Sequence, residues 1–219
     1  VCGSMDFKWG FLAAGIGMLI GLVAFILGQK KYLISGASGF LGKFIIDELA
    51  SEDYDSIGRS KSNTIKFDFA QSEIPLTISS IYNFLIIASG HAHVLTNNDS
   101  EKLLHYNVNY LGTKKLVDAI NKKTLKGVVY ISSVAVYGEN MKIPFREEND
   151  LLGESPYAKS KIASEEYLIE WSKRNDIPVL ILRVPLLAGK HPPGNLGAMI
   201  EAIGKKKYFS VARGQTRRS

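Results

Sequence analysis

The chain has 219 residues, of which 46% are hydrophobic, 22% charged and 10% aromatic. A chain of this length and composition can bury a full core, which excludes a disordered tail, a collagen-like repeat and a small disulfide scaffold. The single cysteine, Cys2, excludes an internal disulfide and a cysteine-based zinc site. The four histidines do not have the spacing of metal ligands, so we expect no metal site.

The formal net charge of +6 is concentrated at the end of the chain. Residues 205–219 hold six Lys and Arg residues and no acid, so residues 1–204 are neutral on balance. A nucleic-acid-binding protein would carry a basic stripe across its folded part, and we therefore expect no nucleic-acid partner. The basic end is either a solvated segment or a site for a small phosphorylated ligand.

Residues 9–29 contain no charged side chain, which distinguishes them from the rest of the chain. About 20 apolar residues suffice to cross a bilayer, and Ala13, Gly17 and Gly21 repeat at the spacing that lets membrane helices approach closely. The segment predicts a transmembrane helix, with a buried core helix as the alternative. The preceding VCGS resembles a cloning scar, and residues 7–33 resemble one helix of the proton-coupled oligopeptide transporters.

From residue 30 onward the sequence predicts alternating strands and helices. Short apolar runs predict strands at residues 31–36, 56–59, 64–67, 82–88, 127–132 and 179–184. Apolar residues at helical spacing predict helices at residues 40–50, 101–122, 156–175 and 195–204. This alternation is typical of an α/β fold whose parallel sheet is covered by helices on both faces.

A glycine-rich segment, GASGFLG, lies between the first predicted strand and the first predicted helix. Glycines at this place let backbone amides and the helix N-terminus meet a diphosphate, as in doubly wound Rossmann-type folds. The alternative is a plain tight turn. The candidate cofactor-binding residues of this segment are Gly36, Ser38, Gly39, Phe40, Leu41 and Gly42.

Arg59 and Ser60 follow the second predicted strand, where NAD-dependent enzymes place an acid for the ribose hydroxyls. A guanidinium suits a 2′-phosphate, so we expect NADP, with NAD as the alternative cofactor and an ordinary exposed arginine as the alternative interpretation. Asp68 and Phe69 follow the next strand, and Asp68 is placed to accept from an adenine amino group. The alternative is that Asp68 caps a helix.

Tyr157 and Lys161 are four residues apart on a predicted helix and therefore share one of its faces. Ser133 ends the preceding strand in YISSVAVYG. These three side chains are candidates for acid/base chemistry, although a Tyr–Lys pair can also be a simple surface contact. A free tyrosine titrates near ~10, and we expect the charge of Lys161 to lower the pKa of Tyr157 toward neutrality.

From residue 31 onward the chain resembles the extended short-chain dehydrogenase/reductases, in the nucleotide-sugar epimerase/dehydratase branch. The motifs that carry this resemblance are GASGFLG, FDFA, LIIASGHAHV, NVNYLGTKKLVDA, YISSVAVYG, SPYAKSK and LILRVPLLAGKHPPGNL. The resemblance implies that Tyr157 is the acid/base on a sugar hydroxyl, that Ser133 orients that oxygen and that Lys161 holds the nicotinamide ribose. Asn109 would lie behind the site, with a helix-surface asparagine as the alternative.

The resemblance also implies cofactor contacts at Ala88, Ser89 and Gly90, and contacts with a nucleoside-diphosphate sugar at Asn195 and Arg218. The family's asparagine after the sixth strand is replaced by Leu186, which leaves the sugar contacts open. We expect three parts, which are a scar and membrane helix at 1–29, a dinucleotide-binding Rossmann domain at 30–184 and a truncated start of the substrate domain at 185–219.

The predicted activity is hydride transfer on a nucleoside-diphosphate sugar by an NAD(P)-dependent epimerase or 4-ketoreductase, of the kind used in polysaccharide biosynthesis. Val134 and Ala135 stand where dehydratases carry an acid beside the catalytic serine, which disfavours a dehydratase. The alternative is a non-catalytic NADP-binding module tethered to a membrane. The resemblance implies a homodimer and a cytoplasmic catalytic domain, and residues 9–29 add the alternative of an anchor in the inner membrane.

Overall fold

The computed structural model describes residues 31–49, 52–71, 75–92, 99–138, 145–189, 192 and 194–207. They fall into two compact units, one within Leu27–Val184 and one that includes the residues from Pro185 onward. The predicted membrane helix at residues 9–29 lies outside the described residues. Within the described ranges, no helix is long and apolar enough to cross a membrane.

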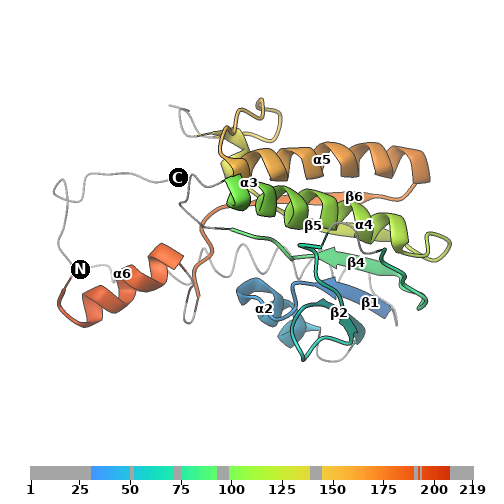
Figure 1. Cartoon of the computed structure of the whole chain (residues 1–219), viewed down its shortest axis with the longest axis horizontal. Helices are drawn as coiled ribbons and strands as arrows, with labels where there is room; N and C mark the ends of the chain where they lie inside the picture. Colours follow the sequence, from blue (N-terminus) through green and yellow to red (C-terminus); the bar gives the residue numbers. More distant parts are fainter. Residues whose placement is uncertain are drawn as a thin grey trace, which may run out of the picture. The chain divides into compact units, whose positions relative to one another are not determined.

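A six-stranded parallel sheet forms the centre of the first unit (Figure 1). Its strands are β1 (Lys31–Ser35), β2 (Asp53–Gly58), β3 (Ile65–Lys66), β4 (Phe84–Ile87), β5 (Gly127–Ser133) and β6 (Val179–Val184). The spatial order is β3-β2-β1-β4-β5-β6, which is the order of the doubly wound dinucleotide-binding fold. The direction of the strand order reverses between β1 and β4, and ligands of such sheets bind at the carboxyl ends of the strands there.

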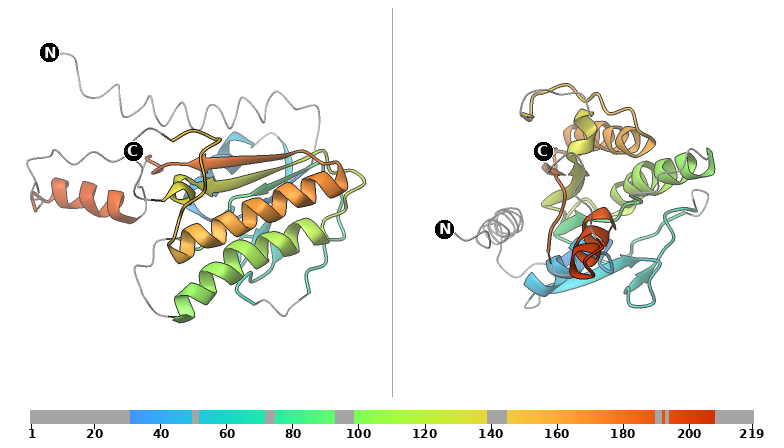
Figure 2. Two further views of the ribbon diagram at one scale, coloured as in Figure 1. Left: turned by 90° about the horizontal axis from the view of Figure 1, so that it is seen from above. Right: turned by 90° about the vertical axis from the view of Figure 1, so that its left-hand side faces the viewer.

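Helices cover both faces of this sheet (Figures 1 and 2). They are α2 (Phe40–Glu48), α3 (Asp99–His105), the π-helical η1 (Tyr106–Leu111), α4 (Gly112–Ala119), the 3-10 helix η2 (Val134–Tyr137) and α5 (Pro156–Asn175). The continuous α3–η1–α4 helix and α5 run side by side over one face, and α2 lies on the other (Figure 2). In the second unit, the described residues include α6 (Gly194–Gly204).

The core of the first unit lies between the sheet and the α4–α5 face. Leu33 of β1 and Leu85 of β4 pack in one buried cluster with Leu116 of α4 and Trp171 of α5. Their strand neighbours, such as Ile34, point to the opposite face because side chains alternate along a strand, and Ile34 is also fully buried. Burial on both faces explains why these strands are continuous apolar runs.

The predicted strands and helices are confirmed, with two differences in detail. β2 begins at Asp53 rather than at residue 56, because the polar Asp55 at its amino end is held by the hydroxyl of Tyr82 at 2.9 Å and by the ammonium of Lys31 at 3.1 Å. The helix predicted at residues 101–122 is divided into α3, η1 and α4, with its middle turns wound as a π-helix. Such widened turns are often found at functional sites.

Candidate functional site

The turn after β1 is packed so tightly that two of its positions have no room for a side chain. Gly36 has a φ of +78°, and a Cβ built on it would lie 2.5 Å from the Ser89 nitrogen and 2.6 Å from the Ala88 oxygen, at the end of β4. A Cβ on Gly42 would lie 2.1 Å from the Gly36 oxygen. The turn is therefore pressed between the end of β4 and the first turn of α2, which only glycine permits.

The N-terminus of α2 faces the same turn. Gly39 caps the helix, its N–H donates to the Gly36 oxygen at 2.9 Å, and no side chain bonds to the cap. A Cβ on Gly39 would meet the Gly36 oxygen at 3.1 Å, so this position is less crowded than Gly36 or Gly42. Ser38 is exposed, while Phe40 and Leu41 are half-buried. A close-packed glycine turn at a helix N-terminus fits the diphosphate of a dinucleotide.

Arg59 lies just beyond the end of β2 and its side chain is 76% exposed. Its Nε is 3.9 Å from the Oδ1 of Asp68, and the same oxygen accepts from the Ala70 N–H at 3.0 Å. Asp68 therefore caps a local turn, and not a helix as in the alternative interpretation, while its carboxylate lies near Arg59. Ser60, next in the chain, shares a hydrogen bond with the hydroxyl of Ser62 at 2.8 Å.

The Phe69 side chain belongs to the core and not to the sheet edge. Its ring packs edge-on against Phe67 at 5.1 Å between centroids, and a Cβ on Gly112 would lie 3.0 Å from its Cδ1. The structure therefore places the ring under α4, so a contact with the cofactor would have to come from the backbone of Phe69.

Gly90, just after the end of β4, lies against α5 and η1. The hydroxyls of Ser35 and Ser89 are hydrogen-bonded at 2.8 Å. A Cβ on Gly90 would lie 3.4 Å from both the Oδ1 of Asn109 and the Nζ of Lys161. Three residues that the sequence placed in separate motifs are therefore neighbours.

Lys161 is buried on the inner face of α5, with 3% of its surface exposed. Its ammonium donates to the Ile131 carbonyl at 2.8 Å and lies 4.7 Å from the centre of the Tyr130 ring. Burial lowers the pKa of Lys161 to about 8, against the opposing effect of the Glu165 carboxylate. The surface-pair alternative is therefore wrong for Lys161.

Tyr157 lies in the first turn of α5, where Ser155 caps the helix by accepting from the Ala158 N–H at 3.1 Å. Burial raises the pKa of the Tyr157 phenol, and a hydrogen bond with Ser133 acts in the opposite direction. The predicted neighbourhood of Ser133 and Tyr157 is therefore present. The expected lowering of the Tyr157 pKa by Lys161 is not observed: burial raises this pKa, and the opposing effect comes from Ser133.

Asn109 is one of the most buried polar residues, with 1% of its surface exposed. Its Oδ1 accepts from the His91 N–H at 2.7 Å, and its Nδ2 donates to the His91 carbonyl at 3.1 Å and to the Ser160 hydroxyl at 2.9 Å. The alternative of a helix-surface asparagine is wrong. Asn109 joins η1 to the loop after β4 and to α5.

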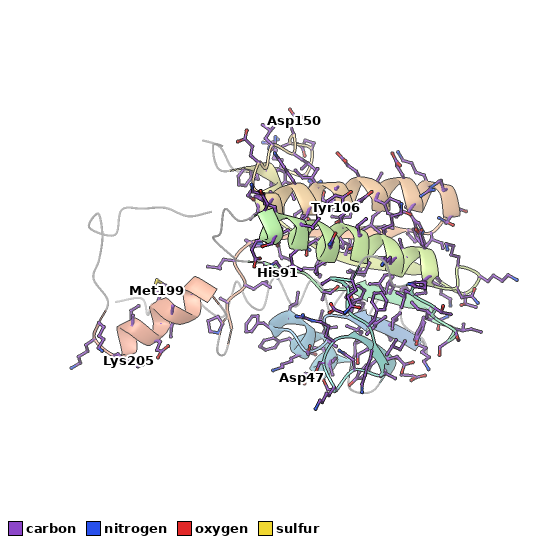
Figure 3. The ribbon with its side chains drawn as sticks, viewed as in Figure 1. Asp47, His91, Tyr106, Asp150, Met199 and Lys205 are labelled. Carbon is purple, nitrogen blue, oxygen red and sulfur yellow. The ribbon has the colours of Figure 1, made fainter. Side chains whose placement is uncertain are left out.

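The sequence did not indicate the neighbouring pair His91 and His105, of which His105 packs on Tyr157. His91 lies in the loop after β4 (Figure 3), and its Nε2 is 3.0 Å from the Oε2 of Glu101 on α3. The buried ring of His105 lies 4.7 Å from the His91 ring and edge-on to Tyr157 at 5.9 Å between centroids. Burial lowers the pKa of His105. No motif spacing marks either residue, because they meet only through the fold.

A buried ion pair between Glu165 on α5 and Arg183 on β6 was also missed, with 2.7 Å between the Nη2 and Oε2 atoms. Two signals were available in the sequence. Arg183 is a charge inside the apolar strand VLILRV, and Glu165 follows Lys161 by one helical turn.

The two predicted sugar-nucleotide contacts belong to the second unit and not to the unit that carries this site. Asn195 lies in the first turn of α6, in the second unit, where its side chain is not described. Arg218 lies outside the described residues. Both contacts stay predictions.

Comparison with known proteins agrees with the motifs and the fold. The family model "NAD dependent epimerase/dehydratase family" matches residues 32–219. The probable UDP-arabinose 4-epimerase 3 of Arabidopsis thaliana is 26% identical over 192 residues, covering 78% of this chain and 47% of that protein. A putative UDP-glucose 4-epimerase of Methanocaldococcus jannaschii is 28% identical over 188 residues, covering 79% and 62%. The chain thus spans about half the length of the curated relatives it matches first.

Solved structures share the fold. A UDP-glucose 4-epimerase of Thermotoga maritima with UDP-glucose has a TM-score of 0.67 at 21% identity, covering 80% of this chain and 63% of that one. RMD of Pseudomonas aeruginosa complexed with NADPH has a TM-score of 0.58 at 24% identity, covering 72% and 54%.

Proposed function

The chain belongs to the NAD dependent epimerase/dehydratase family, and from this premise we propose that it is a nucleotide-sugar 4-epimerase. The observation that carries the proposal is the contact of Ser133 with Tyr157, with Lys161 one helical turn further along α5. Ser133 hydrogen-bonds with Tyr157, and Lys161 lies against Gly90 at the end of β4. Relatives named as 4-epimerases of UDP-sugars support the choice of a nucleoside-diphosphate sugar as substrate.

The proposed cofactor is a nicotinamide dinucleotide, which supplies the hydride acceptor when bound. The glycine turn and the N-terminus of α2 hold its diphosphate, and the Lys161 ammonium holds the nicotinamide ribose. Arg59 favours NADP, because an exposed guanidinium at the end of β2 can pair with a 2′-phosphate. Solved relatives are described with NAD and with NADPH.

In this proposal Tyr157 exchanges a proton with the 4-hydroxyl of the sugar. Burial raises the pKa of the Tyr157 phenol and so favours its protonated form. To act as a base, Tyr157 therefore needs contacts that stabilise the phenolate. Ser133 supplies one such contact, since its hydrogen bond lowers the pKa of Tyr157. A positioned acid/base of this kind contributes about 10²–10⁴-fold to a rate.

A 4-ketoreductase is the second candidate, and Arg59 is the residue that favours it, because NADPH is the common reductant. A non-catalytic binding module is less well supported, since cofactor binding alone does not need the Ser133–Tyr157 contact. The epimerase, the reductase and the binding module differ in whether the cofactor is consumed.

The deciding experiment incubates the protein with UDP-glucose, UDP-arabinose or a UDP-4-keto sugar, each with the oxidised or reduced form of either dinucleotide, and follows the sugar by NMR and the cofactor by absorbance. A 4-epimerase forms the C4 epimer without net cofactor consumption. Consumption of NADPH with a 4-keto sugar would assign the reductase, and binding without turnover would assign the module. Tyr157→Phe should reduce turnover about 10²–10⁴-fold, whereas the matched Tyr106→Phe, on an exposed tyrosine of η1, should not.

A further inference from the structure

The carboxylate of Glu165 is buried one helical turn after Lys161. Glu165 has no exposed surface, and residues four apart on a helix share a face. A buried carboxylate persists in a fold only when it is paired and hydrogen-bonded. The partners of Glu165 therefore indicate what this group does.

Side chains from the two neighbouring strands β5 and β6 hold the Glu165 carboxylate. The Nη2 and Nε atoms of Arg183 donate to its Oε2 at 2.7 and 3.0 Å, and the hydroxyl of Ser132 donates to its Oε1. Ser132 and Arg183 are register partners of β5 and β6. The carboxylate thus ties α5 to the ends of both strands.

The same network continues past the candidate catalytic serine. The Nη1 of Arg183 donates to the Tyr137 hydroxyl at 2.8 Å and to the Glu147 carbonyl at 2.9 Å. Ser132 precedes Ser133 in the chain, and Tyr137 ends the 3-10 turn that follows it. Ser133 is therefore held on both sides by groups bonded to the Glu165–Arg183 pair.

Other titratable groups near Lys161 carry no charge close to pH 8. Burial raises the pKa of Tyr130, under the ammonium, and of Tyr157, on the same helix. Burial lowers the pKa of His105, which packs on Tyr157 from α3. Among the described groups that affect Lys161, Glu165 is thus the one with a stabilising negative charge.

We propose that Glu165 is a positioning residue, whose buried carboxylate keeps the Lys161 ammonium charged and fixes the end of β5 that carries Ser133. It acts through these two residues and does not touch the substrate. The proposal deepens the proposed function, since it rests on Lys161 as the residue that holds the dinucleotide ribose.

The test is an NMR titration of Lys161 in the chain without dinucleotide, with ¹³C-labelled lysine and assignment by loss of the signal in Lys161→Met. Glu165→Gln keeps the size of the side chain and removes its charge. It should lower the Lys161 midpoint by about one pH unit or more, as expected for the loss of a buried opposite charge near the ammonium. Glu166→Gln, the same change at the exposed neighbour, should leave the midpoint in place. Equal midpoints in wild type and Glu165→Gln would overturn the proposal.

Two further variants keep the test decisive if Glu165→Gln folds poorly. Glu165→Asp retains the charge and should leave the Lys161 midpoint unchanged. Arg183→Gln removes the cation that competes for the Glu165 carboxylate and should raise the Lys161 midpoint. A midpoint that moves down in Arg183→Gln, or falls in Glu165→Asp as it does in Glu165→Gln, would overturn the proposal. Failure of the wild type to bind NAD or NADP would refute the proposed function and leave the titration result standing.

Discussion

The side-chain amide of Asn109 donates to the hydroxyl of Ser160 at 2.9 Å, which joins the π-helical turn η1 to α5. The same amide is bonded twice to the backbone of His91, at 2.7 and 3.1 Å. A single buried side chain thus sets the relative positions of the loop after β4 and of α5. That relation places Gly90 against Lys161.

We predict that Asn109→Ala destabilises the protein by about 1–3 kcal/mol, because it leaves the His91 N–H without a partner and removes one of the two hydrogen bonds of the His91 carbonyl. Equilibrium unfolding in urea measures this change. Dinucleotide affinity should also fall, since the loop that carries Gly90 loses its attachment.

The control is Asn107→Ala, on the half-exposed side of the same helical turn. Its free energy of unfolding should change by less than about 0.5 kcal/mol. Equal losses in the two variants would show that the hydrogen bonds of Asn109 carry no special weight.

The glycine turn predicts different outcomes at two positions. Gly39→Ala adds a Cβ 3.1 Å from the Gly36 oxygen, which a small backbone adjustment can accommodate, so the fold should persist while dinucleotide affinity falls. Gly42→Ala places its Cβ 2.1 Å from the same oxygen and should destabilise the fold itself. Circular dichroism and calorimetric titration with NADP separate the two effects. An unchanged affinity of Gly39→Ala for NADP would show that this turn does not bind the diphosphate.

Most of the fold follows from the sequence because strand and helix periods are local properties. The apolar run before Gly36 and the capped start of α5 at Ser155 need only neighbouring residues to be recognised. The π-helical turn at Asn109 is different. Asn109 in this turn bonds to His91 and Ser160, which are distant in the sequence, so local spacing does not reveal these contacts.

The motif residues of the site were predictable, whereas their electrostatics were not. A charge on Lys161 was expected to lower the pKa of Tyr157, but the burial of both groups was not visible in the spacing. Burial raises the pKa of Tyr157 and lowers the pKa of Lys161. The Glu165–Arg183 pair was missed for the same reason, since it forms between a helix and a strand whose contact depends on the whole sheet.

Arg59 predicts a cofactor preference. Arg59→Ala should weaken NADP binding about 10- to 100-fold, the usual effect of losing a charge-assisted hydrogen bond, and leave NAD binding unchanged. Asp68, 3.9 Å from Arg59, should oppose a 2′-phosphate, so Asp68→Asn should tighten NADP binding. Calorimetry with both dinucleotides measures these changes. Lys61→Ala, an exposed cation two residues on, is the control. Parallel losses for NAD and NADP in Arg59→Ala would assign Arg59 a general role instead.

The buried ammonium of Lys161 is expected to destabilise the folded protein. Its pKa falls from 10.5 in the unfolded chain to about 8 in the folded protein, so the unfolded chain binds the proton more tightly. Stability therefore decreases as the pH falls from above 10.5 through 8, and at pH 7 the buried ammonium destabilises the protein by about 3 kcal/mol at most. Lys161→Met keeps the apolar stem and removes the charge. It should raise the free energy of unfolding at pH 7 by about 1–3 kcal/mol, abolish this gain near pH 10.5 and weaken dinucleotide binding. Urea unfolding at the two pH values measures the difference, with the exposed Lys159→Met as control. A loss of stability at pH 7 would mean that the bond to the Ile131 carbonyl outweighs the burial of the charge.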